Sequence, residues 1–515
     1  MTKEKKFLIY GIGLVLVTFI GVTLAYFMTM IQGDKKDVTI NTGDLRVIFN
    51  NGDEIVGSKV EPGWTVTKTF SIENKSKTEY KYNIIIQDLI NTFVSNNMVY
   101  KITSTNSGLN MTDYDVLPKS DTASNKVLSY NNSIAGKTTQ EYTIEIKFKE
   151  EDRNQYEDMG KVLSGNLYIE EGTQKPTTFA SAILRDNPIV SERTDFSVIN
   201  VANTTGTIYK TNKTENSSDV YYYSGNTTNN WVKFGEYYWR IIRTNEDGGV
   251  RLLYVGTNHD SGSGSIAGSD FNKTKYDPID IGYMYGTSGS LESNRTNTND
   301  SSIKTVVDTW YKNNLLTNYD KYISKTAIYC NDRSVGKGTY NVGKAGSTTF
   351  YFGAYARLSL NKAPSYKCGT DASGALFSTA DTADKFSTNT SSGGNGQLQY
   401  PIALMTADEV VFAGGVINTN LSNPYAWYYT DSKGNAITTL SWWLLTPYNC
   451  GSSSNMFNVE ASGKLSNSVV GTYKSNDSAY RDVVRPVLSL NSCVIVTGTG
   501  TATDPYVVDE NASTC

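Results

Sequence analysis

The sequence predicts a transmembrane helix at the N-terminus, then an all-β domain, then a domain of the α+β class. Three observations lead to this fold class. Residues 7–31 form a run of 25 residues without a charged side chain. At residues 142–148 apolar and polar side chains alternate, which is the period of a half-buried strand. At residues 301–311 apolar side chains instead recur at helical spacing, between strand-like segments.

The uncharged run at residues 7–31 is long enough to span a membrane, since about 20 helical residues cross a ~30 Å hydrocarbon core. Lys3, Lys5 and Lys6 precede it, and residues 34–37 after it are locally neutral. Because the cationic flank stays in the cytoplasm, we expect residues 1–6 to be a cytoplasmic tail. We expect the rest to lie outside the cell, on a single-pass membrane anchor. A cleaved signal peptide is the alternative, although the run exceeds an ordinary signal core.

Residues 38–172 are predicted to form one all-β domain. Turn signals at Asn51-Gly52 and Pro62-Gly63 separate strand-like runs. Alternation recurs at residues 142–148 and again at residues 163–169. These patterns are typical of short antiparallel strands with one buried face.

Three segments of this domain stand out, and they are Asn41-Thr42-Gly43-Asp44-Leu45, Pro62-Gly63 and Phe70-Ser71-Ile72-Glu73-Asn74. Together they are similar to the TasA/camelysin family of exported matrix proteins. The resemblance implies an immunoglobulin-like sandwich that acts as a matrix component or spacer. A protease activity sometimes attached to that family has no support, because this segment contains no His and therefore no His-Glu-x-x-His motif.

Residues 173–219 are predicted to be a linker that contains one short helix at residues 179–186. Asn187-Pro188 ends this helix, because the residue before a proline avoids helical geometry.

Residues 220–515 are predicted to form the α+β domain. Residues 237–243 and 250–255 are strands joined by Asp247-Gly248-Gly249, which predicts a hairpin. Thr406-Ala407-Asp408-Glu409 is a capping box that opens a short helix. The domain is organised around residues 441–490, whose two ends are apolar and strand-like and whose middle is rich in Tyr, Asn, Ser and Gly.

Seven motifs stand out in this last domain, and they are Trp442-Trp443-Leu444-Leu445-Thr446-Pro447, Val483-Val484-Arg485-Pro486-Val487-Leu488, Tyr221-Tyr222-Tyr223-Ser224-Gly225, Asn229-Asn230, Trp239-Arg240-Ile241-Ile242-Arg243, Ile281-Gly282-Tyr283-Met284-Tyr285-Gly286 and Cys330-Asn331-Asp332-Arg333-Ser334. With these motifs the domain resembles a large family of uncharacterised bacterial surface modules with a W-L-x-S/T-P … V-R-P-x-L signature. The resemblance covers about the C-terminal three-fifths of the chain and implies a fold similar to the C-type lectin and formylglycine-generating-enzyme group. A fold does not fix a function.

The polar middle of residues 441–490 is the predicted ligand-binding face. Tyr, Ser, Asn and Gly are the mixture that antibody paratopes use, since Tyr supplies contact area and the small polar residues adapt their hydrogen bonds. Trp442, Trp443, Arg485 and Pro486 are expected to lie behind this face as its support. The expected ligand-binding residues are Tyr448, Asn449, Ser452, Ser453, Asn455, Tyr473, Asn476 and Tyr480.

The five cysteines all follow residue 320, and an exported protein can form disulfides. We predict the pairs Cys330–Cys368 and Cys493–Cys515, with Cys450 left over, although spacing alone does not fix the connectivity.

No catalytic, metal or cofactor site is predicted. His259 is the single His and is interpreted as a solvated loop residue, so a nucleophile would lack a base. Asp408 and Glu409 are explained by their place in a first helical turn. No zinc-ligand spacing is visible, and the Glu-Pro-Asn and Gln-Pro-Asp motifs of calcium-dependent lectins are missing. The net charge of −4 argues against nucleic acid as a partner.

The sequence therefore favours a non-catalytic recognition or adhesion protein at the cell surface, with an extracellular protein or glycan as ligand. A structural role in an extracellular matrix or fibre is the alternative. Every residue at positions 448–455 is reachable from an Asn codon by changes at adenines. Related modules look like targets of diversity-generating retroelements, so diversification of this loop is a further hypothesis, and an Asn- and Ser-rich surface loop is its simpler explanation.

Overall fold

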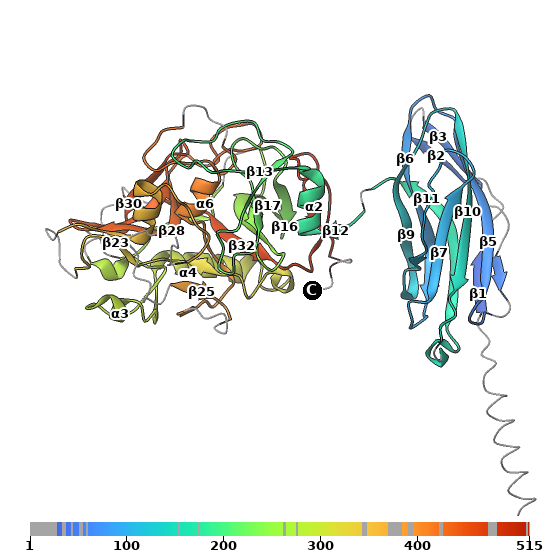
Figure 1. Ribbon diagram of the computed structural model, residues 1–515, viewed down its shortest axis with the longest axis horizontal. Helices are drawn as coiled ribbons and strands as arrows, with labels where there is room; N and C mark the ends of the chain where they lie inside the picture. Colours follow the sequence, from blue (N-terminus) through green and yellow to red (C-terminus); the bar gives the residue numbers. More distant parts are fainter. Residues whose placement is uncertain are drawn as a thin grey trace, which may run out of the picture. The chain divides into compact units, whose positions relative to one another are not determined.

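The computed structural model divides the chain into two compact units, unit 1 (Met1–Lys175) and unit 2 (Pro176–Cys515). Each unit has its own hydrophobic core. Figure 1 draws unit 1 as strands and unit 2 as strands with short helices. In the four N-terminal strands, at residues 28–32, 38–42, 45–50 and 55–57, the structure describes the backbone only. The structure describes residues 28–32, 38–42, 45–50, 55–57, 60–152, 155–173, 175–260, 264–273, 277–341, 348–368, 384–389, 395–421, 426–471, 482–510, 513 and 515.

Unit 1 is a sandwich of two β-sheets. One sheet has the strand order β4-β1-β11-β6-β9 and the other the order β2-β3-β5-β10-β7-β8. Residues 142–148 bury every second side chain, as the alternation predicted, and residues 163–169 do the same. The strands are β1 (Met28–Gln32), β2 (Val38–Thr42), β3 (Leu45–Asn50), β4 (Ile55–Gly57), β5 (Thr65–Asn74), β6 (Tyr80–Asn91), β7 (Met98–Ser104), β8 (Asp115–Val116), β9 (Ser120–Ile134), β10 (Thr138–Phe148) and β11 (Val162–Glu171).

The expected transmembrane helix at residues 7–31 is wrong. Its last residues belong to β1, which pairs in parallel with β11 and antiparallel with β4, so their backbone groups are bonded within a sheet. In the part of the chain that the structure describes, no helix has the length and apolarity needed to cross a membrane. Residues 1–27, which include the expected tail and most of the expected helix, lie outside the described residues.

Unit 2 is built on two larger sheets. The first, of 11 strands, runs β12-β33-β34-β16-β17-β15-β14-β13, with β18 joining β17 to β32 and β27 next to β32. Its strands are β12 (Thr177–Thr178), β13 (Ile189–Glu192), β14 (Thr207–Thr211), β15 (Val220–Tyr222), β16 (Trp231–Phe234), β17 (Tyr237–Thr244), β18 (Val250–Gly256), β27 (Ile402–Leu404), β32 (Pro486–Leu490), β33 (Ile495–Thr497) and β34 (Tyr506–Val508).

The second sheet, of seven strands, carries the motif around Trp442. Its order is β19-β31-β28-β24-β23, and β29 continues it from β28 to β30. Its strands are β19 (Ala267–Gly268), β23 (Val335–Lys337), β24 (Phe350–Phe352), β28 (Trp442–Cys450), β29 (Ser454–Val459), β30 (Leu465–Val469) and β31 (Val483–Val484). The small sheets pair β20 (Met284–Tyr285) with β21 (Asn299–Asp300) and β22 (Tyr329–Cys330) with β25 (Lys385–Ser387), which also pairs with β26 (Gly396–Gln397).

The helices of unit 2 are short, and strands predominate over helices among the described residues, so the α+β expectation gives way to a mostly β unit. Ser301 caps the longest helix through the backbone N–H of Lys304, at 3.3 Å. Thr406 and Glu409 form the predicted capping box. The helices are α2 (Phe179–Asp186), α3 (Leu291–Asn294), α4 (Ser302–Asn314), α5 (Gly353–Tyr355) with the π-turn Ala356–Leu360, and α6 (Ala407–Phe412).

The expected linker at residues 173–219 is also corrected. The helix α2 has the predicted bounds, but its apolar face, with Phe179 and Ile183, is buried in the core of unit 2. The strand β12 pairs with β33 near the other end of the sequence, and β13 and β14 extend the large sheet. These residues belong to the folded unit because they complete its sheet, and the boundary between the units falls at Lys175.

Candidate functional site

The expected support of the binding face is a buried layer. Trp442 and Trp443 are fully buried on β28, and the indole N–H of Trp443 donates to the carbonyl of Ser269 at 2.7 Å. The Arg485 guanidinium lies over the Trp442 ring at 4.6 Å. It also donates to the carbonyl of Tyr428, at 2.6 Å. The two halves of the signature motif therefore hold each other in place.

Tyr448, by contrast, is not on the exposed face. It is only 9% exposed, and its ring packs edge-on against Tyr351, Tyr355 and Phe457. The register of β28 against β29 shifts between Pro447 and Asn449, which leaves Tyr448 between the paired positions. The ring is buried because these neighbouring aromatic rings cover it, among them the half-exposed Tyr351 of β24.

The other described members of the predicted face meet at the tip of the β28–β29 hairpin. The side-chain amide of Asn455 donates to the side-chain oxygen of Asn449 at 2.7 Å and to the Ser453 hydroxyl at 3.1 Å. Ser452 at the turn is exposed. The remaining three predicted residues, Tyr473, Asn476 and Tyr480, lie outside the described residues.

Asn449 and Asn455 form part of a row of exposed or half-exposed side chains that crosses five strands. The register pairs Lys337 with Tyr351, Tyr351 with Asn449, Asn449 with Asn455, and Asn455 with Val469. Residues directly opposite each other share one face of a sheet. All five are exposed or half-exposed, whereas Phe350, Cys450 and Ser454 in the adjacent row are buried. We call Lys337, Tyr351, Asn449, Asn455 and Val469 the cross-strand row.

The aromatic part of the row is fixed in place by stacking. Tyr351 and Tyr355 stack with ring centroids 4.0 Å apart, and the Lys337 ammonium lies 5.7 Å from the Tyr351 ring. Sequence reasoning missed these three residues because they lie about a hundred positions before the hairpin. The alternation in Phe350-Tyr351-Phe352 was the available signal for a half-exposed Tyr.

A second feature of unit 2 is a cavity of about 270 Å³ that the sequence did not predict. It is lined by the end of β17, the β17–β18 turn, the π-turn after α5 and the first turn of α6. Asp408 and Glu409 both line it. Arg357 donates to the two oxygens of Asp408 at 3.0 and 2.9 Å and to Asp332 at 2.6 Å. Burial alone would lower the pKa of Arg357, but these carboxylates raise it above its usual value.

Glu409 serves both the helix and the cavity. One carboxylate oxygen accepts from the backbone N–H of Thr406 at 2.9 Å, closing the capping box. The other accepts from Arg251, also at 2.9 Å. Glu409 thus closes the predicted capping box, and arginines engage both acidic residues of α6, which the sequence did not predict.

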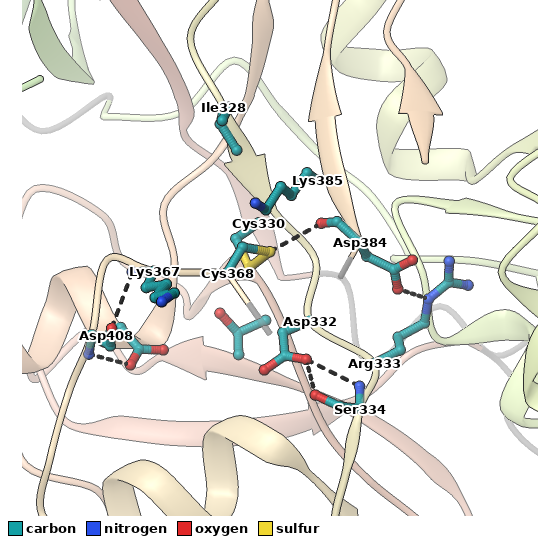
Figure 2. Close-up of a disulfide and its surroundings, with 12 residues drawn as sticks. Ile328, Cys330, Asp332, Arg333, Ser334, Lys367, Cys368, Asp384, Lys385 and Asp408 are labelled. Carbon is teal, nitrogen blue, oxygen red and sulfur yellow. Dashed lines mark hydrogen bonds and ion pairs between the residues drawn. A yellow bond between two sulfur atoms is a disulfide. The ribbon is translucent and has the colours of Figure 1, made fainter. Parts of the chain in front are cut away.

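Both predicted disulfides are formed, which confirms the pairing. Cys330–Cys368 lies between Lys367 and Asp408 on one side and Asp384 and Arg333 on the other (Figure 2). Cys493–Cys515 closes the C-terminal segment, and Cys450 is a buried free thiol. Burial raises the pKa of Cys450.

His259 is half-buried rather than solvated. Its Nδ1 lies 2.9 Å from the Ser432 hydroxyl, and its ring meets the edges of Trp231 and Tyr238. Among the described residues, no three His, Cys, Asp or Glu side chains are grouped so that they could hold a metal ion.

Comparison with known proteins places only part of the chain. A family model described as a domain of unknown function (DUF6273) matches residues 290–492, a range that contains both halves of the signature motif and the cross-strand row. No curated protein matches the chain. A solved structure described as "AvmM Catalyzes Macrocyclization in Alchivemycin A Biosynthesis" is 10% identical, with a TM-score of 0.15, and the likeness covers 28% of this chain and 100% of that chain. A likeness that weak carries no argument about fold or activity. What the comparisons show is that residues 290–492 are similar to DUF6273.

Proposed function

We propose that this chain is a non-catalytic recognition protein that works outside the cytoplasm and binds an extracellular protein or glycan through unit 2. The observation that carries the proposal is the cross-strand row. It sets an aromatic ring, two side-chain amides and one ammonium group side by side on the solvent face of a sheet whose other face is buried. Such a surface offers contact area and adaptable hydrogen bonds on a rigid base.

On the two resemblances, unit 1 is a TasA/camelysin-like spacer with an immunoglobulin-like fold, and unit 2 is a C-type-lectin-like module. The two disulfides support a location outside the cytoplasm, because thiols inside it are kept reduced. The carboxylates of α6 receive no catalytic role, since arginines and the capping box engage them.

A binding survey with matched variants tests the proposal. The purified chain is applied to an array of defined glycans and to a panel of matrix glycoproteins. Tyr351→Ala should weaken the strongest signal by about tenfold or more, as loss of an aromatic anchor does. Ser466→Ala is the control, because Ser466 lies on β30 but outside the row, and it should bind like the wild type. Equal binding by both variants, or no saturable signal at all, would refute recognition through this row.

A structural role in a matrix is the second candidate, and the strand β9 favours it. This strand is 15 residues long and lies at the end of its sheet, where an unpaired edge can template association with another chain. Sedimentation and electron microscopy of the purified chain test it. Fibres that a proline at Lys126 abolishes would support this role, and a chain that stays monomeric at high concentration would oppose it.

Diversification of the hairpin is a separate proposal about its coding region. Asn449, Ser452, Ser453 and Asn455 lie at the tip, where substitutions alter the surface and leave the Trp layer intact. A second, near-identical copy of the region that differs at adenines and lies beside a reverse transcriptase gene would support it.

A further inference from the structure

The cavity of unit 2 is lined by residues that carry buried polar atoms without a hydrogen-bond partner among the described residues. The side chain of Asn245 is 8% exposed, and neither its amide nitrogen nor its oxygen is bonded. The Tyr366 hydroxyl and the Nε of Arg243 lack partners as well. All three residues line the cavity. Because each such group costs about 1–3 kcal/mol, native proteins seldom keep several at one place without a use.

The local fold does not require these polar atoms. The β17–β18 turn is closed by the backbone of Asn245, whose N–H donates to the Gly249 carbonyl at 2.7 Å. Tyr366 is held by its ring, which stacks on Phe412 at 4.2 Å and lies under the Arg243 guanidinium at 4.6 Å. Leu at the first position and Phe at the second would pack in the same way. The amide and the hydroxyl are therefore surplus to packing.

Among the arginines that line the cavity, Arg243 has spare binding capacity. Arg251 and Arg357 make ion pairs of 2.9 Å or less, whereas Arg243 lies 3.6 Å from Glu246 and 3.8 Å from Glu409. Burial, and then the neighbouring Arg251, lower the pKa of Arg243. An additional carboxylate at its Nε would relieve both effects.

The remaining charges of the cavity favour a ligand that is not simply an anion. Its lining contains six carboxylates and four cationic side chains. Asp247 is exposed, and Glu246 behind it is half-buried. The excess of carboxylates would repel a ligand that is only an anion, and a ligand that is only a cation would leave the Nε of Arg243 unpaired. A molecule with one charge of each sign can pair with Arg243 and with a carboxylate.

We propose that the cavity binds a small zwitterion of amino-acid size. Its carboxylate accepts hydrogen bonds from the Nε of Arg243 and the amide nitrogen of Asn245. Its ammonium group donates to the carboxylates of Glu246 and Asp247. The volume of about 270 Å³ lies just below the ~300–1,000 Å³ of pockets for drug-sized ligands, which sets the size class. The proposal is independent of the cross-strand row, because none of the row's residues lines the cavity.

Thermal unfolding of the purified full chain tests the proposal. The probes are the twenty standard amino acids at millimolar concentration, with a set of monosaccharides, acetate and methylammonium for comparison. At least one amino acid should raise the melting temperature, because a ligand that binds only the folded state stabilises it. Acetate and methylammonium, each of which carries half of the zwitterion, should give no shift.

Two variants separate binding from stability. Asn245→Leu and Tyr366→Phe should melt no lower than the wild type without ligand, because they remove unpaired buried atoms. Asn245→Leu should abolish the ligand-induced shift, and Tyr366→Phe, which removes the third unpaired group at the cavity, should weaken binding by about tenfold. Tyr223→Phe is the control, since its hydroxyl bonds to Asn187 at 2.8 Å away from the cavity. It should lower the melting temperature and keep the shift.

Three results would overturn the proposal. One is the absence of a shift with every amino acid, which would mean that water alone fills the cavity. Another is a shift with monosaccharides only. The third is an amino-acid shift that survives in Asn245→Leu, which would place the binding elsewhere.

Discussion

Trp443 shows what a single side chain contributes to the sheet behind the proposed binding face. It is fully buried, packs edge-on against Phe271 and bonds to the carbonyl of Ser269. Trp443→Ala should lower the free energy of unfolding by about 3–5 kcal/mol, as large core truncations do. Asn449→Ala should change it by less than about 1 kcal/mol, as most exposed substitutions do. Urea unfolding of both variants measures the difference, and similar values for the two would contradict the assignment of core and surface.

Tyr448 carries a prediction opposite to the one that its sequence context favours. A Tyr at the start of a polar loop is expected to be a binding anchor, yet here its ring lies among Tyr351, Tyr355 and Phe457. Tyr448→Ala should therefore cost roughly 3 kcal/mol of stability or more. Urea unfolding measures it, and a variant as stable as the wild type would show that the ring is not part of the core.

Asp384 gives the unfolding free energy a dependence on pH. The carboxylate is fully buried and accepts from Arg333 at 2.5 Å, Arg295 at 3.2 Å and Asn395 at 2.7 Å. Burial would raise its pKa, but the two arginines hold it below the usual value. Because the folded pKa is depressed, the stabilisation is complete above the unfolded value of about 3.9 and is lost as the pH falls below it. Between pH 6 and pH 3 the melting temperature should fall less steeply for Asp384→Asn than for the wild type. An equal fall in the two proteins would contradict this.

At the scale of elements, the disulfide Cys330–Cys368 cross-links two segments beside the cavity, which Cys330 lines. The two residues are 38 positions apart, so the loop-entropy model gives about 3–4 kcal/mol for the cross-link. Cys330→Ser should lower the melting temperature of unit 2, and a reducing agent should do the same to the wild type. Cys450→Ser is the matched control, because that thiol is buried but unpaired with another cysteine. A larger loss in Cys450→Ser than in Cys330→Ser would contradict the expectation.

The elements that the sequence predicted correctly are those with local signals. The helix α2, the hairpin β17–β18 and the capping box of α6 each follow from spacing, turn residues or caps within a few positions. The pairing of β12 with β33 joins positions about three hundred residues apart, and no local pattern encodes it. The β1 strand shows the same limit, since an apolar run carries no sign of the sheet that will accept it.

The candidate site was predictable to a similar degree. Composition located the tip of the β28–β29 hairpin, because Asn449, Ser452 and Asn455 follow an apolar strand. It did not predict that neighbouring aromatic rings cover Tyr448, nor that Tyr351 is the residue across the sheet from Asn449. The cavity was beyond reach, because its lining comes from segments spread between Glu215 and Thr446.

At the scale of the whole molecule, the chain is two units with separate cores. The described core of unit 1 ends at Ile169, and that of unit 2 begins at Phe179. Thr173 still bonds to Asn83 within unit 1, whereas Thr177 already pairs with Val496 within unit 2. Only a few residues separate these two attachments, so we treat each unit as a folding domain of its own.

Independent folding follows from this organisation and can be measured. A fragment of residues 176–515, expressed alone with its disulfides formed, should unfold at the temperature of the matching transition in the full chain, because the described core of unit 2 is built from its own residues. Calorimetry of the full chain should then show two transitions, one of them superimposable on that of the fragment. Trp443→Ala should shift this transition and leave the other in place, and Ile144→Ala in the core of unit 1 should do the reverse. A single cooperative transition that both substitutions move together would contradict independent units.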